Sequence, residues 1–327
     1  MRNLSVTLPF ITALVAGAFL TGCSSAGSSG APSVSQNAAQ AGRGFPSSIR
    51  PMGSDLQTKL AVADLGNGSH VSTIDILNPQ KSYQMVQTIN NGRLNTSDWY
   101  DHAGNLYVTT NAPSVLEYPK GATSESFTYS TGLATPQMVT TDGAGNVYVA
   151  DRYADGNGAI LEYPQDSNTP SYECANGFQP FGVAVDRKGD VFESAVQYQQ
   201  YPPTGVLLKY KGGLANCSTP KLLGVTLSRN PAGLQIDQSR NLVACDERNH
   251  AVYIIAPPYN AITTTITGVL DPRHTAINKN QDLIYVADPG NYAIEIFSYP
   301  SGTYLMTLNS DYGIWQPIGV ALVPPRA

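Results

Sequence analysis

The stretch DGAGNVYVAD, from Asp142 to Asp151, decides the fold of this chain because related stretches recur along it. DHAGNLYVTT begins at Asp101, DRKGDVFESA at Asp186, DQSRNLVACD at Asp237 and NKNQDLIYVAD at Asn278. Three copies have glycine followed by asparagine or aspartate at the fourth and fifth positions, a dipeptide that supplies the positive φ of a tight turn. An alternation of apolar residues, typical of a strand, follows this dipeptide. The copies therefore predict a repeated β-hairpin.

The sequence around each hairpin predicts two further strands. A strand such as 181–185 precedes the turn, a third strand ends in segments such as 161–164, and a threonine-rich fourth strand such as 262–267 closes the unit. Four short antiparallel strands in roughly 45 residues is the size of a β-propeller blade. A helical repeat is excluded because the apolar residues recur at a period of two.

The two ends of the repeat region predict how the ring closes. Residues 316–323, QPIGVALV, match the first strand of a unit, but no unit follows them. Residues 59–64, KLAVAD, match a second strand that lacks its first. We therefore expect the C-terminal strand to complete the first blade, which removes the exposed sheet edges. The prediction is an all-β, six-bladed propeller with four-stranded antiparallel blades over residues 56–327.

The blade pattern resembles a known repeat family. The segments PFGVAVD (180–186), GNVYVAD (145–151) and AILEY (159–163) resemble NHL-repeat and related six-bladed propellers, and the resemblance covers residues 56–327. The resemblance implies the fold. It leaves the function open, because that fold carries hydrolases, lyases, lactonases and binding modules.

The N-terminal region predicts export and a membrane anchor. Residues 1–22 have the basic start, apolar run and small residues of a signal peptide. The ending LTGC resembles the lipobox of bacterial lipoproteins, which implies a lipidated Cys23, and Ser24 after it implies sorting to the outer membrane of a Gram-negative bacterium. The alternative is an ordinary secretory signal that contains a cysteine. Residues 23–55 are rich in serine, glycine and alanine and predict a flexible tether at the cell envelope.

Composition limits the classes of partner. Charged residues make up 13% of the chain, the net charge is −5, and no lysine or arginine run occurs, which argues against nucleic acid. We expect a monomer. Cys174 and Cys217 are a candidate disulfide in an oxidising compartment, with two free thiols as the equal alternative.

Chain direction separates the loops into two groups. The hairpins share one face, and the connections between second and third strands share the other with the blade crossovers; we call these the hairpin face and the loop face. The candidate ligand-binding residues assigned to the loop face are Arg152, Arg248, Arg273, His274, Tyr198, Trp99 and Trp315. Arginines beside aromatic rings can hold an anionic sugar, a carboxylate or a peptide. Alternatively, the arginines pair with neighbouring aspartates.

A partial ring of aspartates is also expected on the loop face. Its members are Asp64, Asp151, Asp246 and Asp288. Such a ring could hold Ca²⁺ or a cationic ligand. We favour the other interpretation, in which each carboxylate accepts hydrogen bonds from the backbone of its own loop, because the residue belongs to the repeat itself.

Signatures of catalysis are sparse. Of the histidines only His274 occupies a channel position, whereas zinc-dependent propellers need several. The inner strands at 138–140, 183–185, 234–236 and 275–277 predict no inward carboxylate other than the hairpin aspartates. We therefore favour a membrane-tethered binding or scaffold module that recognises a protein, peptide or glycan and requires no cofactor. The alternatives are a metal-dependent lactonase or lyase with its site in the channel, and a structural envelope component.

Overall fold

The computed structural model describes residues 59–67, 71–198 and 201–323. The predicted signal peptide 1–22, the lipidation residue Cys23 and the tether 23–55 lie outside the described residues. Among the residues described, no helix has the length and apolar character needed to cross a membrane.

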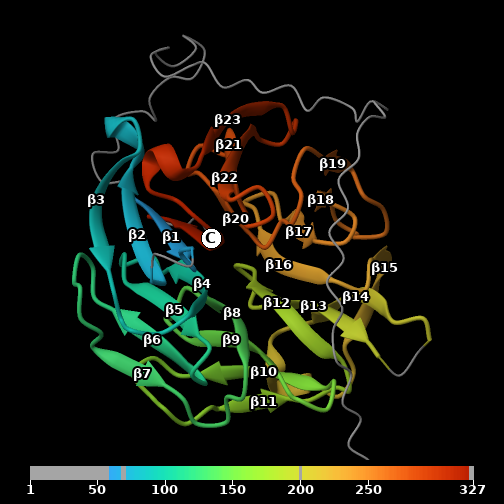
Figure 1. Ribbon diagram of the computed structural model, residues 1–327. Helices are drawn as coiled ribbons and strands as arrows, with labels where there is room; N and C mark the ends of the chain where they lie inside the picture. Colours follow the sequence, from blue (N-terminus) through green and yellow to red (C-terminus); the bar gives the residue numbers. More distant parts are fainter. Residues whose placement is uncertain (1–58, 68–70, 199–200, 324–327) are drawn as a thin grey trace, which may run out of the picture. The chain divides into compact units, whose positions relative to one another are not determined.

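Six four-stranded antiparallel sheets form a ring, with the first strand of each nearest the centre (Figure 1). Blade 1 contains, from the centre outward, β24 (Pro317–Leu322), β1 (Leu60–Asp64), β2 (Thr73–Asn78) and β3 (Gln84–Ile89). Blade 2 contains β4 (Asn95–Tyr100), β5 (Leu106–Thr110), β6 (Ser114–Tyr118) and β7 (Phe127–Tyr129). Blade 3 contains β8 (Pro136–Thr141), β9 (Val147–Arg152), β10 (Gly158–Tyr163) and β11 (Tyr172–Cys174).

The other three blades repeat this order. Blade 4 contains β12 (Gln179–Val185), β13 (Val191–Gln197), β14 (Thr204–Tyr210) and β15 (Lys221–Leu227). Blade 5 contains β16 (Pro231–Ile236), β17 (Leu242–Asp246), β18 (Ala251–Ile255) and β19 (Thr264–Ile266). Blade 6 contains β20 (His274–Ile277), β21 (Leu283–Asp288), β22 (Ala293–Ser298) and β23 (Tyr304–Leu308). The predicted six-bladed propeller is confirmed.

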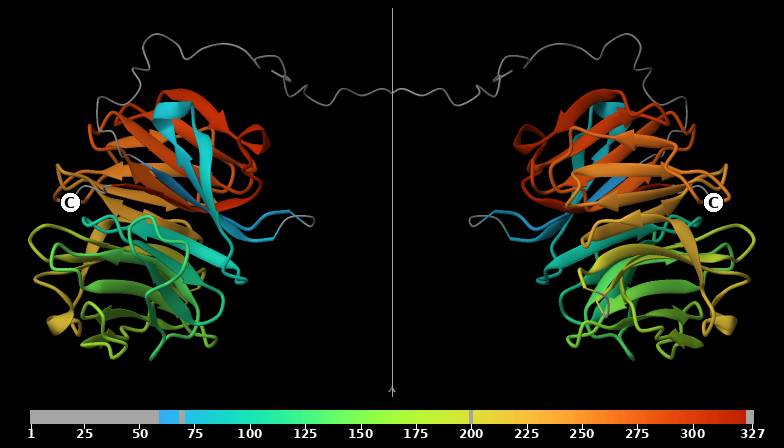
Figure 2. Two further views of the ribbon diagram at one scale, coloured as in Figure 1. Left: turned by 90° about the vertical axis from the view of Figure 1, so that its left-hand side faces the viewer. Right: turned by 90° about the vertical axis from the view of Figure 1, so that its right-hand side faces the viewer.

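The ring closes through the composite first blade, as predicted. β24 pairs antiparallel with β1, with Leu322 opposite Leu60 and Val320 opposite Val62. The pairing gives the inner strand of blade 1 a partner from the opposite end of the described chain. Figure 2 shows the ring from two sides, with the hairpin formed by β1 and β2 projecting from it.

The repeated aspartate builds the turn between the first two strands of a blade. In blade 3, Asp142 Oδ1 accepts the backbone N–H groups of Ala144 and Asn146 at 2.9 Å, and Oδ2 accepts the Asn146 side-chain amide at 2.9 Å. Gly145 has φ +88°, which a side chain would strain. The repeated aspartate and glycine therefore serve one local structure, the tight turn between the first two strands of a blade.

The core lies between neighbouring blades rather than in one place. Successive side chains of a strand point to opposite faces, so Val62 packs in the cluster shared by blades 6 and 1, whereas Ala61 packs in the cluster shared by blades 1 and 2. Both faces of β1 are covered, which is why its residues LAVAD are all buried. This packing holds the inner strands rigidly around the central channel.

Candidate functional site

A cavity of about 270 Å³ lies where the six inner strands meet. Each inner strand contributes to its lining: Ser97 from β4, Met138 from β8, Phe181 from β12, Gly233 from β16, His274 from β20 and Ile318 from β24. Leu65, Asp271, Pro289 and Gln316 add lining from connections of the loop face. The cavity is therefore the channel at its loop-face end, the place that the sequence indicated.

The four loop-face aspartates are buried and bonded to the backbone. Asp151 accepts the N–H groups of Ala134 and Thr135 at 2.8 and 2.7 Å. Asp288 accepts those of Leu270 and Asp271 at the same two distances. The aspartates bond to backbone, as the favoured interpretation predicted, but these donors belong to the preceding blade crossover rather than to the aspartate's own loop, so the carboxylates fasten the crossover to the second strand.

Asp64 and Asp246 are used in the same way. Asp64 accepts the N–H groups of Gly66, Trp315 and Gln316, and Asp246 accepts those of Ser228 and Asn249. Within the described part of the chain, no group of three or more histidine, cysteine, aspartate or glutamate side chains is arranged to hold a metal ion.

Arg152 ends β9 and reaches the rim of the cavity. Its guanidinium carbon lies 4.5 Å from the centroid of the Phe181 ring, and Nη1 donates to Gln137 Oε1 at 3.3 Å. Nε is buried and has no hydrogen-bond partner among the described residues. Burial lowers the pKa of Arg152, and the nearby Tyr198 phenol opposes that lowering. Tyr198, which follows the end of β13, is thus close enough to Arg152 to influence its charge.

Arg273 has a different environment from Arg152. Its guanidinium pairs with Glu247 at 3.1 Å and with Asp271 at 3.1 Å. Its charge is balanced by these two carboxylates. This agrees with the alternative in which the loop-face arginines pair with neighbouring acidic residues. Arg248, beside Glu247, is exposed on the same face.

His274 is the histidine of the cavity, as its position in the repeat predicted. The ring is only 2% exposed, Nδ1 lies 3.0 Å from the Val320 carbonyl oxygen, and Nε2 has no partner within the described residues. Burial lowers the pKa of His274 to about 4, and the hydrogen bond to Val320 opposes this. The imidazole is therefore neutral at pH 7.

The two tryptophans lie at opposite ends of the channel. The Trp315 backbone N–H donates to Asp64 Oδ2 at 2.7 Å, which fixes it on the loop face. Trp99 pairs with Tyr107 beside the turn of blade 2, and its indole Nε1 donates to Thr141 at 3.1 Å. The assignment of Trp99 to the loop face was wrong, because its strand runs toward the hairpins and Trp99 stands two residues before the turn.

Asp98 is a buried carboxylate on an inner strand that the sequence analysis of inward carboxylates did not include. It lies on β4, is 0% exposed, and neither oxygen has a hydrogen-bond partner in the part of the chain described. A Cβ at Gly319 would lie 2.5 Å from Asp98 Oδ1, so the carboxylate faces blade 1. Burial raises its pKa well above the ordinary value. The signal was present in the sequence, since Val139, Val183 and Leu234 occupy this position in other blades.

The residues Ser97, Gln137 and Phe181 of the cavity were also missed. These three residues form no recognisable motif in the sequence, and they line one cavity only because the ring places their three blades around it.

Cys174 and Cys217 are free in the structure, and Cys174 Sγ lies 3.6 Å from the Cys217 carbonyl oxygen. The two cysteines pack in the same apolar cluster. A disulfide between them stays a prediction.

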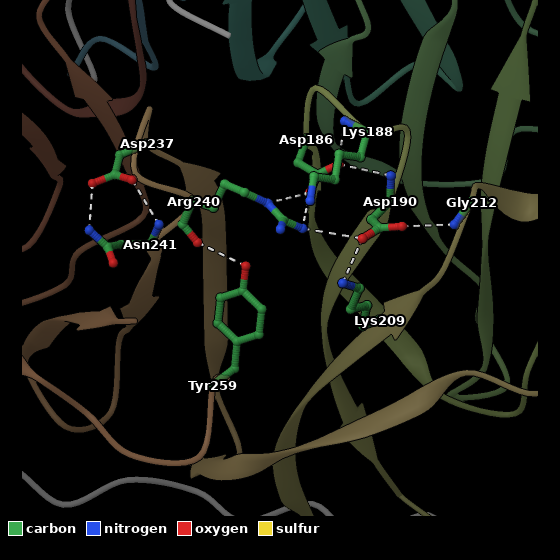
Figure 3. Close-up of polar contacts among 9 residues, drawn as sticks. All are labelled: Asp186, Lys188, Asp190, Lys209, Gly212, Asp237, Arg240, Asn241 and Tyr259. Atoms are coloured by element: carbon green, nitrogen blue, oxygen red, sulfur yellow. Dashed lines mark hydrogen bonds and ion pairs between the residues drawn. The ribbon is translucent and has the colours of Figure 1, made fainter. Parts of the chain in front are cut away.

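The hairpin face carries a second charged cluster, between blades 4 and 5 (Figure 3). Arg240 contacts Asp186 through Nη2 and through Nε at 2.8 Å, and Asp190 at 3.2 Å. Lys209 lies 2.6 Å from the same Asp190 carboxylate. Arg240 and Lys209 thus each lie beside a carboxylate, and the Arg240 contacts join blades 4 and 5 without leaving these two cations open to a ligand.

Comparison with known proteins supports the fold. No protein-family model and no curated protein matches the chain. A chain from the structure titled "Crystal structure of Nidogen/Laminin Complex" matches with a TM-score of 0.66 and 15% identity, over 83% of this chain and 100% of that chain. A protein of unknown function from Bacteroides caccae matches with a TM-score of 0.61 and 12% identity, over 82% of this chain and 99% of that chain.

A third match is more distant. A functionally unknown protein from Desulfotomaculum acetoxidans DSM 771 has a TM-score of 0.55 and 11% identity, with 83% of this chain and 100% of that chain covered. At these identities the similarity shows the fold alone: the described chain is a six-bladed β-propeller that shares its architecture with proteins of very different sequence.

Proposed function

We propose that the protein is a non-catalytic binding module, tethered to the cell envelope through Cys23, whose central cavity receives a carboxylate carried by a protein, peptide or glycan. The observation that carries the proposal is the half-buried guanidinium of Arg152, which forms no ion pair within the described residues. Glu247, whose charge reaches Arg152, is already paired with Arg273.

An unbalanced cation at the rim of a cavity is costly to the folded protein. Partial removal of a charge from water is unfavourable unless an opposite charge or hydrogen bonds replace the solvent. The contact with the Phe181 ring returns about 0.5–2 kcal/mol of this cost. A carboxylate would supply the missing opposite charge, and its two oxygens match the donors of a guanidinium. Arg152 is therefore placed to bind a carboxylate better than it binds any group of the protein.

The size of the cavity limits what can enter. About 270 Å³ lies just below the range of small-molecule sites, which occupy about 300–1,000 Å³. A whole protein surface cannot enter such a space, but a terminal unit of a larger ligand can. Tyr198 is 45% exposed near Arg152 and offers a contact surface for the remainder of that ligand.

The wider context is compatible with a binding role. The signal peptide and lipobox of the sequence support a position at the envelope, and the net charge of −5 does not favour nucleic acid. A chain of similar fold belongs to a structure titled as a protein complex. That similarity supports the proposal only as a precedent for the architecture.

The test is retention of carboxylate ligands by the full-chain protein on a surface that carries sugar acids, peptide acids and the neutral amide of each. Wild-type protein should retain the acids. Arg152→Gln should weaken their binding roughly 10- to 100-fold, the effect of losing charged hydrogen bonds of about 1.5–3 kcal/mol. The matched control is Arg187→Gln, which removes an equal charge from an exposed position on the hairpin face. Equal retention of acids and amides, or an unchanged Arg152→Gln protein, would contradict the proposal.

A further inference from the structure

His274 presents a hydrogen-bond acceptor to the cavity. Nδ1 contacts both the carbonyl oxygen of Val320, which can only accept, and the Val320 N–H, which can only donate; we assign the proton to Nδ1 because the contact with the carbonyl oxygen is the shorter, at 3.0 Å. The Val320 N–H approaches the same nitrogen at the longer distance of 3.3 Å. Because the imidazole is neutral, Nε2 keeps an unshared lone pair, and no group among the described residues donates to it.

Ser97 adds a second polar group to the same space. It occupies in blade 2 the position that His274 occupies in blade 6, and its Oγ is buried without a hydrogen-bond partner in the described part of the chain. Three of the remaining four blades have glycine at this position: Gly182, Gly233 and Gly319. A Cβ at any of these glycines would lie within 2.5–2.6 Å of an atom of a blade strand or crossover, so the glycines allow close packing there, and among these positions only His274 and Ser97 carry polar side chains to the cavity lining.

The cavity therefore presents buried groups that need hydrogen-bond donors, and the unbalanced cation Arg152 stands beside it, in contact with the lining residues Phe181 and Gln137. Resting on the function proposed above, we infer that the ligand unit is a sugar acid, whose carboxylate binds Arg152 and whose hydroxyl groups donate to His274 Nε2 and exchange hydrogen bonds with Ser97 Oγ. A hydroxyl is the group that suits both sites, since it donates to the imidazole and both donates to and accepts from serine.

The C-terminus of a peptide fits this set of groups less well. It has only one N–H donor close to its carboxylate, whereas the cavity presents the acceptor His274 Nε2, the hydroxyl of Ser97 and the carboxylate of Asp271. The neighbouring hydroxyl groups of a sugar ring can satisfy several acceptors at once. An acceptor left without a donor in a buried site costs binding free energy, which gives the cavity a means of discrimination.

The experiment is calorimetric titration of the full-chain protein with four probes. D-glucuronate carries a carboxylate and hydroxyls, cyclohexanecarboxylate carries the acid on a ring without hydroxyls, D-glucose lacks the acid, and trialanine is a peptide acid. D-glucuronate is expected to bind at least ~10-fold more tightly than the other three. Absence of binding by all three acids would contradict the proposed function itself. Equal binding of D-glucuronate and cyclohexanecarboxylate, or tighter binding of trialanine, would overturn the inference and leave the carboxylate site standing.

A second measurement tests the two polar groups directly. In ¹⁵N spectra of the imidazole, the free protein should show the proton on His274 Nδ1, and the Nε2 signal should shift with D-glucuronate but not with cyclohexanecarboxylate. Ser97→Ala should weaken the binding of D-glucuronate roughly tenfold and leave the binding of cyclohexanecarboxylate unchanged. Ser124→Ala, an exposed serine of the same blade, is the control. A proton found on Nε2, or equal loss of both probes in Ser97→Ala, would overturn the assignment.

Discussion

The hairpin face and the loop face each place an arginine between two blades, and the two arginines have opposite surroundings. Arg240 contacts Asp186 and Asp190, so its charge is balanced within the fold (Figure 3). Arg152 has an aromatic ring and one amide oxygen beside it and no carboxylate partner in the described residues. Both arginines link neighbouring blades, but only Arg152 retains binding capacity for a ligand. The comparison shows that the balance of charge, more than the presence of arginine, distinguishes a structural contact from a candidate site.

The largest effect is expected from breaking the balanced side of this comparison. Asp186→Ala removes the acceptor for Arg240 and for the backbone N–H groups of Lys188 and Asp190. The free energy of unfolding should fall by about 3 kcal/mol, because loss of this nearly buried carboxylate leaves two backbone donors without partners and leaves Arg240 with Asp190 alone. Urea denaturation measures this change.

The control for that prediction is the neighbouring exposed side chain. Arg187→Ala should change the free energy of unfolding by no more than about 0.5 kcal/mol. A loss in Asp186→Ala as small as the control would show that the cluster does not hold the two blades together.

A smaller effect is expected from Asp98, a buried carboxylate on the inner strand of blade 2. Its raised pKa means that the folded state favours the protonated form, so the contribution of Asp98 to stability is fully present below pH 3.8 and is lost as the pH rises through the raised value. Asp98→Asn should therefore be more stable than wild type by about 2 kcal/mol at pH 8. Near pH 3.5 the two proteins should be equal.

Urea denaturation at the two pH values checks this sign. Parallel pH profiles for the wild type and Asp98→Asn would mean that the carboxylate is not held in an unfavourable site. The result also sharpens the comparison, because Asp98 would be the anionic counterpart of Arg152: a charge that the fold leaves unbalanced.

The smallest effect is expected from Arg240→Gly. Arg240 has φ +67°, at the turn position where other blades have Gly104, Gly145 and Gly189. Glycine would relieve about 1 kcal/mol of backbone strain, while loss of the partly exposed ion pair costs a similar amount. The net loss in free energy of unfolding should be below about 1 kcal/mol and should vanish in 1 M NaCl, since salt screens exposed pairs.

Salt titration of both proteins separates the two contributions. A loss that persists at high salt would show that Arg240 acts through the packing of its side chain rather than through its charge.

The sequence predicted the fold because each blade repeats the same local structure. An aspartate of the turn, such as Asp142, and an aspartate at the end of the second strand, such as Asp151, each recur in four blades, and together with the strand patterns and the two chain ends they indicate six four-stranded blades. The site was predicted only in part. Arg152, Tyr198 and His274 stand where the repeat pattern placed them, but Ser97 and Phe181 belong to no motif.

The errors have a common physical origin. Trp99 was assigned to the wrong end of the channel and Asp98 was overlooked, and both lie on β4, whose sequence NTSDWY departs from the apolar pattern of the other inner strands. Periodicity predicts well where the repeat is followed. Where the repeat is broken, the direction of a side chain and its partners depend on the neighbouring blade.

The pairing of β24 with β1 has a consequence for how the chain acquires its structure. The two strands stand at opposite ends of the described sequence, so the ring is complete only after the last strand has been made. Until then, the innermost position of blade 1 is empty and two sheet edges can pair with other chains. A chain that stops before Pro317 should therefore be prone to aggregate even though five of its blades are intact, and a chaperone that shields β1 would act at the final step of maturation.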